Sequence, residues 1–315
     1  MSGTGVPPTS PSPLDRSVDF PKGSPLDMKN RGVISVIGRD QKGIVARVST
    51  YLAGQNINIE DIEQRIVEGL FLMSMRVDLT DVSTTLDEVI LGLKQIGAEI
   101  GVEITLRLAG GRERKRVAIL VTKEPHCLEA LIRDQRAGKL NGDPVVVLSN
   151  HGVLRPLAEA AGIPFFWKDA EDKAAHEAFL AEKIREYRAD LIVLARYMRI
   201  LSSEFVAKLP NRIINIHPSL LPYHPGANAY KQAWEEGVRV SGCTAHFATA
   251  QLDQGPVILQ DVFQIRVGED TLDDVKAKGR ALEGEVLSQA VQLFLNDQLI
   301  VKESKVIFRP GRLGE

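Results

Sequence analysis

The sequence predicts an α/β protein, in which a ferredoxin-like βαββαβ domain precedes a mostly parallel, doubly wound sheet. Two observations carry this prediction. Residues 31–108 contain strand and helix patterns in the order strand, helix, strand, strand, helix, strand. From residue 115 to 307, apolar runs of strand length alternate with segments of helical spacing, which is typical of a parallel sheet covered by helices on both faces. We expect a linker between the two regions near residues 109–113.

Composition narrows the class of protein. The chain has 315 residues, 44% of them hydrophobic, which is enough for two domains, and its net charge of −2 argues against bulk electrostatic binding of nucleic acid. Cys127 and Cys243 form neither a CxxC motif nor a disulfide framework, as in a reducing compartment. No apolar run is long enough to span a bilayer. We therefore expect a cytoplasmic protein that binds neither nucleic acid nor membrane.

Residues 1–28 are rich in Pro, Ser and Gly and lack the apolar core of a signal peptide. Such a composition buries too little surface to offset the entropy of ordering. We expect a disordered tail.

The strands and helices expected in the first domain, residues 29–109, can be placed one by one. We expect a strand at 31–37, a helix at 43–53, strands at 57–66 and 70–77 around a turn at Glu68-Gly69, a helix at 86–96 and a strand at 103–108.

A turn of the form Asp-x-x-Gly, from Asp40 to Gly43, leads into the first of these helices. The free amide donors of a helix N-terminus can hold a carboxylate. With residues 55–59, this stretch resembles an ACT domain, a module that often binds a small effector, commonly an amino acid. The resemblance implies effector contacts from Asp40, Gly43, Ile44 and Asn58. A capped helix without a ligand, in a module that serves only assembly, explains the same residues. Since ACT-like domains usually assemble side by side, a homo-oligomer is expected.

The second domain, residues 114–315, alternates strand and helix. We expect strands at 117–122, 145–149, 190–195 and 213–216, helices at 128–137, 153–161 and 174–187, and a further strand at 242–249. Neither a dinucleotide fingerprint nor a P-loop motif is present. Ligands of such sheets bind at the carboxyl ends of the strands.

Three polar residues mark this edge of the sheet. Asn215 and His217 lie two residues apart at a strand end, so their side chains share a face, and Asp253 precedes a Gly-Pro turn. Pro218 and Pro222 stiffen the turn after the histidine. Each polar residue alone is more often structural. Together they supply what chemistry on a formyl carbonyl needs, namely oxyanion donors and a group that moves protons.

With their flanks, these residues resemble the active site of the superfamily that uses 10-formyltetrahydrofolate. The resemblance implies that Asn215, His217 and Asp253 are catalytic. It implies a supporting role for His246, on the strand. His224, in the loop after Pro222, is a further candidate for a supporting role, apart from the resemblance. The resemblance also implies folate contacts from Met198, Arg199, Ile200, Leu201, Ala248, Leu252 and Gly226.

Three histidines and Asp253 could in principle form a metal-ligand set. There is no HxxxH helix pair or cysteine pair, however, and formyl transfer needs no Lewis acid. We expect no metal and no cofactor, 10-formyltetrahydrofolate being the substrate.

The choice between transferase and hydrolase depends on other segments. Where glycinamide ribonucleotide transformylases carry a Gly-Ser-Asn phosphate loop, this chain has Glu124, which repels a phosphate, and Pro125, which lacks an amide donor. Residues 126–128, 149–151 and 195–198, preceded by an ACT-like domain, resemble formyltetrahydrofolate deformylases. That resemblance implies hydrolysis to formate and tetrahydrofolate, which balances one-carbon pools and supplies formate for purine synthesis.

Two positions depart from the deformylase pattern. Pro218 stands where that pattern usually has a second histidine, and Gln254 stands where Glu is common. If the missing histidine positions water, hydrolysis would be slower, or the formyl group would pass to an amine. A formyltransferase with a phosphate-free amine acceptor therefore stays an alternative. An ACT-based small-molecule sensor is another, although a sensor has no need of Asp253.

Overall fold

The computed structural model describes residues 30–108, 114–223 and 228–310. The expected tail at 1–28, the linker at 109–113, His224 and Gly226 lie outside these residues. The chain divides into two compact units, one formed by residues 1–112 with 309–315 and the other by 113–308.

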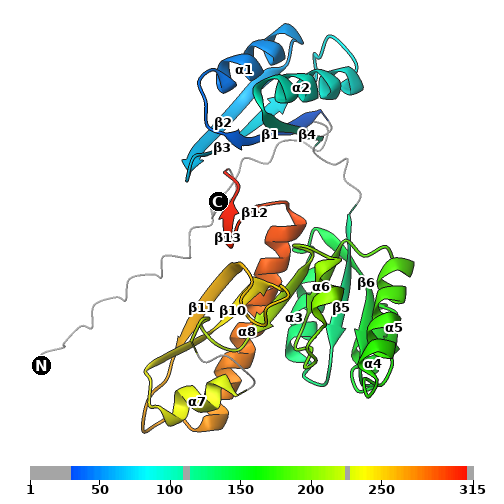
Figure 1. Ribbon diagram of the computed structural model, residues 1–315, viewed down its shortest axis with the longest axis vertical. Coiled ribbons are helices and arrows are strands. Elements are labelled where there is room, and N and C mark those ends of the chain that lie inside the picture. Colours follow the sequence, from blue (N-terminus) through cyan, green and yellow to red (C-terminus); the bar gives the residue numbers. More distant parts are fainter. Residues whose placement is uncertain (1–29, 109–113, 224–227, 311–315) are drawn as a thin grey trace, which may run out of the picture. The chain divides into compact units, whose positions relative to one another are not determined.

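The first unit is a four-stranded antiparallel sheet in the order β2-β3-β1-β4 with two helices packed against it, as Figure 1 shows. The βαββαβ prediction is confirmed. The elements are β1 (Arg31–Arg39), α1 (Ile44–Gly54), β2 (Asn58–Val67), β3 (Leu70–Asp78), α2 (Leu86–Ile100) and β4 (Val102–Leu108).

Local sequence sets the ends of α2. A capping box precedes it, in which the Thr85 side chain accepts from the Glu88 backbone amide and the Glu88 side chain accepts from that of Thr85. Gly101 ends the helix in the left-handed conformation, with φ 65°. The helix then buries Val89 and Leu93 in the core of this unit, against Ile34 and Met73 of the sheet.

The second unit contains a seven-stranded sheet in the order β11-β10-β9-β8-β5-β6-β7. The five strands from β9 to β7 are parallel, and β10 and β11 are antiparallel additions at one edge. The strands are β5 (Lys115–Val121), β6 (Gly142–Ser149), β7 (Phe165–Trp167), β8 (Leu191–Leu194), β9 (Ile213–His217), β10 (Val240–Phe247) and β11 (Val257–Gln264). A separate hairpin is formed by β12 (Leu299–Lys302) and β13 (Lys305–Phe308).

Helices cover both faces of this sheet, which confirms the doubly wound prediction. Along β5, Val117, Ile119 and Val121 enter one core, and Ala118 and Leu120 enter the other. The first core is closed by α3 (His126–Arg136), α4 (Arg155–Ala160) and α8 (Leu272–Leu295), and the second by α5 (Lys173–Glu186) and α6 (Ser203–Ala207). The remaining helix, α7 (Ala229–Glu235), packs against α8. None of the described helices is both long and apolar enough to cross a membrane.

The longest helix, α8, has no counterpart among the elements expected from the sequence. It buries small and polar residues as well as large apolar ones, so it lacks a clean apolar stripe. Gly284 explains why small residues are needed, because a Cβ there would lie only 3.0 Å from the Cβ of Ala130 on α3. The close approach of α3 and α8 therefore replaces the usual stripe of large side chains.

Burial of α2 can be tested with two leucines of the same helix. Leu93 is 1% exposed and Leu91 is 57% exposed. Leu93→Ala should lower the free energy of unfolding by about 2–5 kcal/mol, since it leaves a cavity in the core. Leu91→Ala should change it by less than about 0.5 kcal/mol. Urea unfolding of the full chain, followed by circular dichroism, measures both, and equal losses would contradict this placement of α2.

Candidate active site

A cavity of about 330 Å³ lies at the carboxyl ends of β8 and β9, beside the loop that follows β10. The topology explains its position, because strand order reverses between β5 and β8 and leaves a crevice at this edge. The cavity brings together three groups of residues predicted from the sequence. Its lining includes Asn215, His217 and Asp253, the segment Met198, Arg199, Ile200 and Leu201, and the residues His246, Ala248 and Leu252.

Strand register aligns the polar groups. β9 pairs with antiparallel β10 so that Asn215 is opposite His246 and His217 is opposite Thr244. Because successive side chains alternate between faces, Asn215 and His217 point to the same side of the sheet. Asp253 reaches this side from the loop after β10, with a left-handed backbone at φ 54° that aspartate tolerates better than most residues.

Asp253 and His217 form the polar centre of the site. Nδ1 of His217 lies 3.3 Å from Oδ2 of Asp253, and their side chains are 7% and 12% exposed. The hydrogen bond from His217 lowers the pKa of Asp253 and outweighs its burial, so the carboxyl is ionised at neutral pH. The other ring nitrogen of His217, Nε2, is buried and has no hydrogen-bond partner among the described residues. Since His217 lines the cavity, this nitrogen is the group that a bound substrate would meet.

His246 holds the amide of Asn215. The amide nitrogen of Asn215 lies 3.1 Å from Nε2 of His246, and Nδ1 of His246 lies 3.0 Å from the carbonyl oxygen of Phe247. In the tautomer that satisfies both contacts, Nδ1–H donates to Phe247 and Nε2 accepts from Asn215. Burial lowers the pKa of His246, which agrees with a neutral ring. Asn215 keeps a second N–H that His246 does not use.

The turn after His217 is fixed by two residues that the sequence analysis did not identify. The Thr244 hydroxyl donates to the carbonyl oxygen of Ser219 at 2.7 Å and accepts from the amide of Leu221 at 3.0 Å. The side-chain amide of Gln260 donates to the Leu221 carbonyl oxygen and to the Thr244 hydroxyl. Thr244 lies opposite His217, so β10 holds both this strand end and the turn that leaves it.

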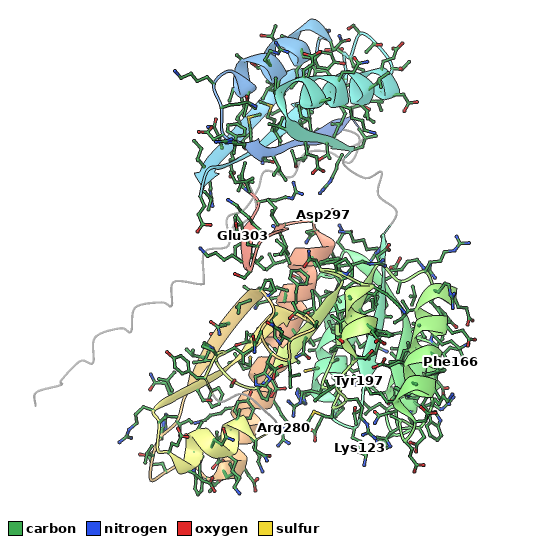
Figure 2. The ribbon with its side chains drawn as sticks, viewed as in Figure 1. Lys123, Phe166, Tyr197, Arg280, Asp297 and Glu303 are labelled. Carbon is green, nitrogen blue, oxygen red and sulfur yellow. The ribbon has the colours of Figure 1, made fainter. Side chains whose placement is uncertain are left out.

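Hydrogen bonds also anchor the segment predicted to contact folate. The amide of Met198 donates to the hydroxyl of Thr122, which donates to the side chain of Asn150. Tyr197, labelled in Figure 2, is buried, and its hydroxyl lies 2.6 Å from Nε2 of His176. Beyond this anchor, Met198 and Ile200 are 48% and 64% exposed. Exposed apolar side chains at the mouth of a cavity suit a flat, partly apolar ligand.

The predicted effector residues lie in the first unit. Gly43 is the N-cap of α1, with φ 91°, and no side chain caps the helix. Asp40 and Asn58 are exposed, whereas Ile44 is buried in the core, so its side chain is not available to a ligand. Effector binding stays a prediction.

Two family models match the chain, an ACT domain over residues 31–107 and a formyl transferase over residues 115–291. A formyltetrahydrofolate deformylase of Bacillus subtilis is 39% identical over 284 residues, 89% of this chain and 94% of the relative. One of Escherichia coli K12 is 37% identical, over 88% of this chain and 98% of the relative.

Solved structures of formyltetrahydrofolate deformylases and of glycinamide ribonucleotide transformylases also match the chain. A formyltetrahydrofolate deformylase from Pseudomonas syringae pv. tomato matches with a TM-score of 0.81 and 31% identity, over 89% of this chain and 94% of that one. Glycinamide ribonucleotide transformylase 1 from Symbiobacterium toebii matches with a TM-score of 0.60 and 34% identity, over 64% of this chain and 99% of that one. The match to the transformylase leaves about a third of this chain uncovered. On the full-length matches, the chain belongs to the formyltetrahydrofolate deformylase family.

Proposed function

We propose that this chain hydrolyses 10-formyltetrahydrofolate to formate and tetrahydrofolate. One observation carries the proposal, namely that Asn215, His217 and Asp253 line one cavity together with the segment from Met198 to Leu201. The relatives that match nearly the whole chain are named for this reaction.

In the proposed mechanism, the contact between His217 and Asp253 orients the imidazole ring. The Asp253 carboxylate accepts from Nδ1–H of His217, and in the mechanism that we propose the protonated ring donates from Nε2–H to the formyl oxygen. The free N–H of Asn215 is the second donor to this oxygen. Negative charge that develops on the oxygen during attack is therefore met by two donors already in position.

Asp253 also handles the proton of the nucleophile. Water attacks the formyl carbon and gives one proton to the carboxylate oxygen that His217 does not use. The bond from carbon to N10 then breaks and N10 takes up a proton, which yields tetrahydrofolate and formate. Water and the folate are the only reactants, so the proposal calls on no further cofactor.

Formyl transfer to an amine is the second candidate. The observation that favours it is Pro218, a buried residue of the cavity wall that supplies no polar side-chain group where the deformylase pattern has a histidine. Pro125 at the N-cap of α3 opposes it for phosphate-bearing acceptors, because this helix start lacks one amide donor. Formate released from 10-formyltetrahydrofolate by the purified chain, with no acceptor added, separates the two candidates.

The proposal includes a cytoplasmic homo-oligomer whose ACT unit binds a small molecule, an amino acid being the expected class. Support for the compartment comes from Cys127 and Cys243, which are buried free thiols. Support for the module comes from the family model over residues 31–107. Analytical ultracentrifugation with and without amino acids tests assembly and effector together.

Asp253 carries the first test of the mechanism. Asp253→Asn keeps the shape of the side chain but removes the charge that orients His217 and accepts the proton. We expect kcat for formate release to fall by about 10²–10⁴, the range for loss of a positioned acid or base. Asp261→Asn, an exposed aspartate on β11, is the matched control and should retain full activity. If Asp253→Asn stays folded and keeps most of its turnover, Asp253 has no part in the chemistry.

His246 carries a pH dependence of stability. Its folded-state pKa is below the unfolded value of about 6.5, so below pH 7 the unfolded chain binds more protons than the folded one. The contribution of His246 to the free energy of unfolding is therefore lost as pH falls. Between pH 7.5 and 5.5 the wild type should lose stability more steeply than His246→Gln. Parallel curves in urea unfolding would show that His246 is not held neutral.

A further inference from the structure

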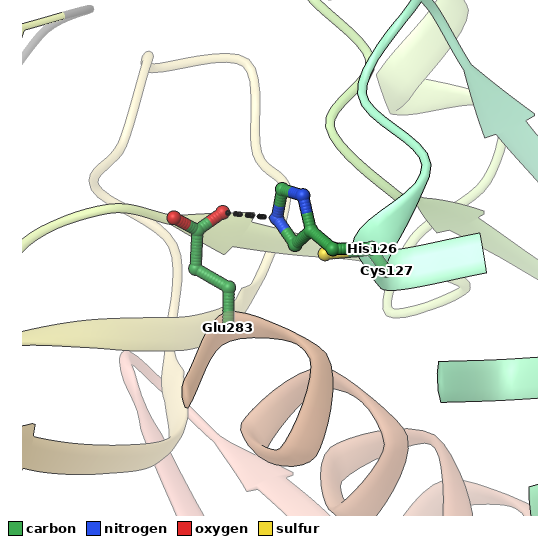
Figure 3. Close-up of side chains that lie close together, drawn as sticks. All are labelled: His126, Cys127 and Glu283. Carbon is green, nitrogen blue, oxygen red and sulfur yellow. Dashed lines mark hydrogen bonds and ion pairs between the residues drawn. The ribbon is translucent and has the colours of Figure 1, made fainter. Parts of the chain in front are cut away.

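Glu283 is a buried carboxylate that the proposed chemistry does not use. It lies in the middle of α8 and is 1% exposed. A carboxylate at such a position needs charged or hydrogen-bonding partners, because loss of hydration is costly. Two partners are present. Nε of Arg196 lies 3.3 Å from Oε2 of Glu283, and Nε2 of His126 lies 3.2 Å from the same oxygen, a contact drawn in Figure 3.

These contacts join three distant parts of the second unit. His126 is the first residue of α3, Arg196 follows β8, and Glu283 comes from α8. Two of the three segments that resemble deformylases, residues 126–128 and 195–198, thus meet at this carboxylate. The third segment, residues 149–151, supports the same region. The side chain of Asn150 accepts from the hydroxyl of Thr122, and this hydroxyl accepts from the amide of Met198.

Arg196 connects this cluster to the active site. It lines the cavity that holds Asn215, His217 and Asp253, and its own side chain is only 17% exposed. Its backbone has φ 59°, a left-handed conformation that arginine adopts only when its surroundings impose it. Arg196 therefore contributes to the cavity wall, and its side chain is paired with Glu283.

Glu283 has a further buried neighbour, Tyr230. Tyr230 is buried against α8, where a Cβ at Gly279 would lie 2.3 Å from its ring. Burial, and then the charge of Glu283, raise the pKa of Tyr230, so its hydroxyl is neutral. The charges nearby are Glu124, 3.9 Å from His126, and Arg280, 3.9 Å from Glu124. Arg196 is thus the positively charged side chain paired directly with Glu283 among the described residues.

A metal site is the competing interpretation of the cluster. Ligand atoms of His126, Cys127 and Glu283 all lie within 4.8 Å of one another, and these residue types bind zinc. Two features oppose it. Arg196 already places a positive charge beside the Glu283 oxygen, and burial together with the charge of Glu283 raises the pKa of Cys127, which keeps it a thiol. The cluster is better suited to hold a guanidinium than a metal ion.

We propose that Glu283 is a positioning residue that holds Arg196 in the cavity wall, and that this wall excludes amine acceptors. The proposal rests on the hydrolysis proposed above and specifies why water is the nucleophile. In this proposal the wall leaves room for water beside the formyl carbon but not for a larger amine acceptor. A protonated amine is also repelled by the fixed guanidinium.

If the wall is removed, an amine should compete with water. The amine nitrogen attacks the formyl carbon and loses a proton to Asp253, the bond to N10 breaks, and N10 takes up a proton. The products are a formamide and tetrahydrofolate. The ratio of formamide to formate therefore reports on the wall, and a general loss of stability does not change it.

The experiment uses the full chain with 10-formyltetrahydrofolate and glycinamide, a small primary amine, as the probe. For the wild type we expect formate with little N-formylglycinamide. Arg196→Ala should raise the ratio of N-formylglycinamide to formate at least tenfold, and Glu283→Gln should raise it in the same direction. The double variant should match Arg196→Ala alone, because both changes act through one guanidinium.

The double variant removes both charges at once, so it leaves no unpaired buried ion and tests the wall even if a single variant does not fold. Glu285→Gln is the matched control, an exposed glutamate of the same helix that pairs with Arg133, and its product ratio should equal that of the wild type.

The proposal is overturned if folded Arg196→Ala and the double variant release formate with the wild-type product ratio. Failure of the underlying hydrolysis looks different, because the wild type would then release no formate in the absence of glycinamide. Wild-type transfer to glycinamide at rates above hydrolysis would overturn both.

Discussion

The pairing of β9 with β10 is the constraint on which the site depends. Its register places His246 opposite Asn215 and Thr244 opposite His217, so one strand orients an amide and fixes the turn beyond the imidazole. A slip of one residue would turn each of these side chains to the other face of the sheet. Ile214 and Ile216, between the polar positions, are buried in the core and oppose such a slip. Burial of these isoleucines on one face of β9 therefore keeps Asn215 and His217 in position on the other face.

The two histidines of the site show how surroundings assign different roles to the same side chain. His246 is buried beneath Asn215 and keeps a neutral ring that accepts the amide N–H. His217 lies beside Asp253, whose carboxylate is ionised because of that contact. One ring accepts from the amide of Asn215, and the other contacts the Asp253 carboxylate and leaves its second nitrogen unpartnered among the described residues.

The sequence predicted what depends on local periodicity and missed what depends on tertiary contact. Strand and helix patterns within residues 31–108 and 115–217 are local, and the structure confirms their order. Asn215 and His217 were predicted to lie together at a strand end, the family resemblance added Asp253, and all three line one cavity. By contrast, α8 carries small residues that allow close packing against α3. Glu283 contacts His126, which lies 157 residues away in the sequence. Thr244 and Gln260 likewise gain their roles only through the turn that they bind.

The central claim is that water attacks the formyl carbon in the cavity of Asn215, His217 and Asp253. It is tested most directly by turnover of 10-formyltetrahydrofolate in ¹⁸O-enriched water, without an added amine, and mass analysis of the formate. We expect formate that carries one ¹⁸O atom, because one oxygen comes from the formyl group and the other from solvent. Unlabelled formate, or a formyl group recovered on another molecule, would contradict it.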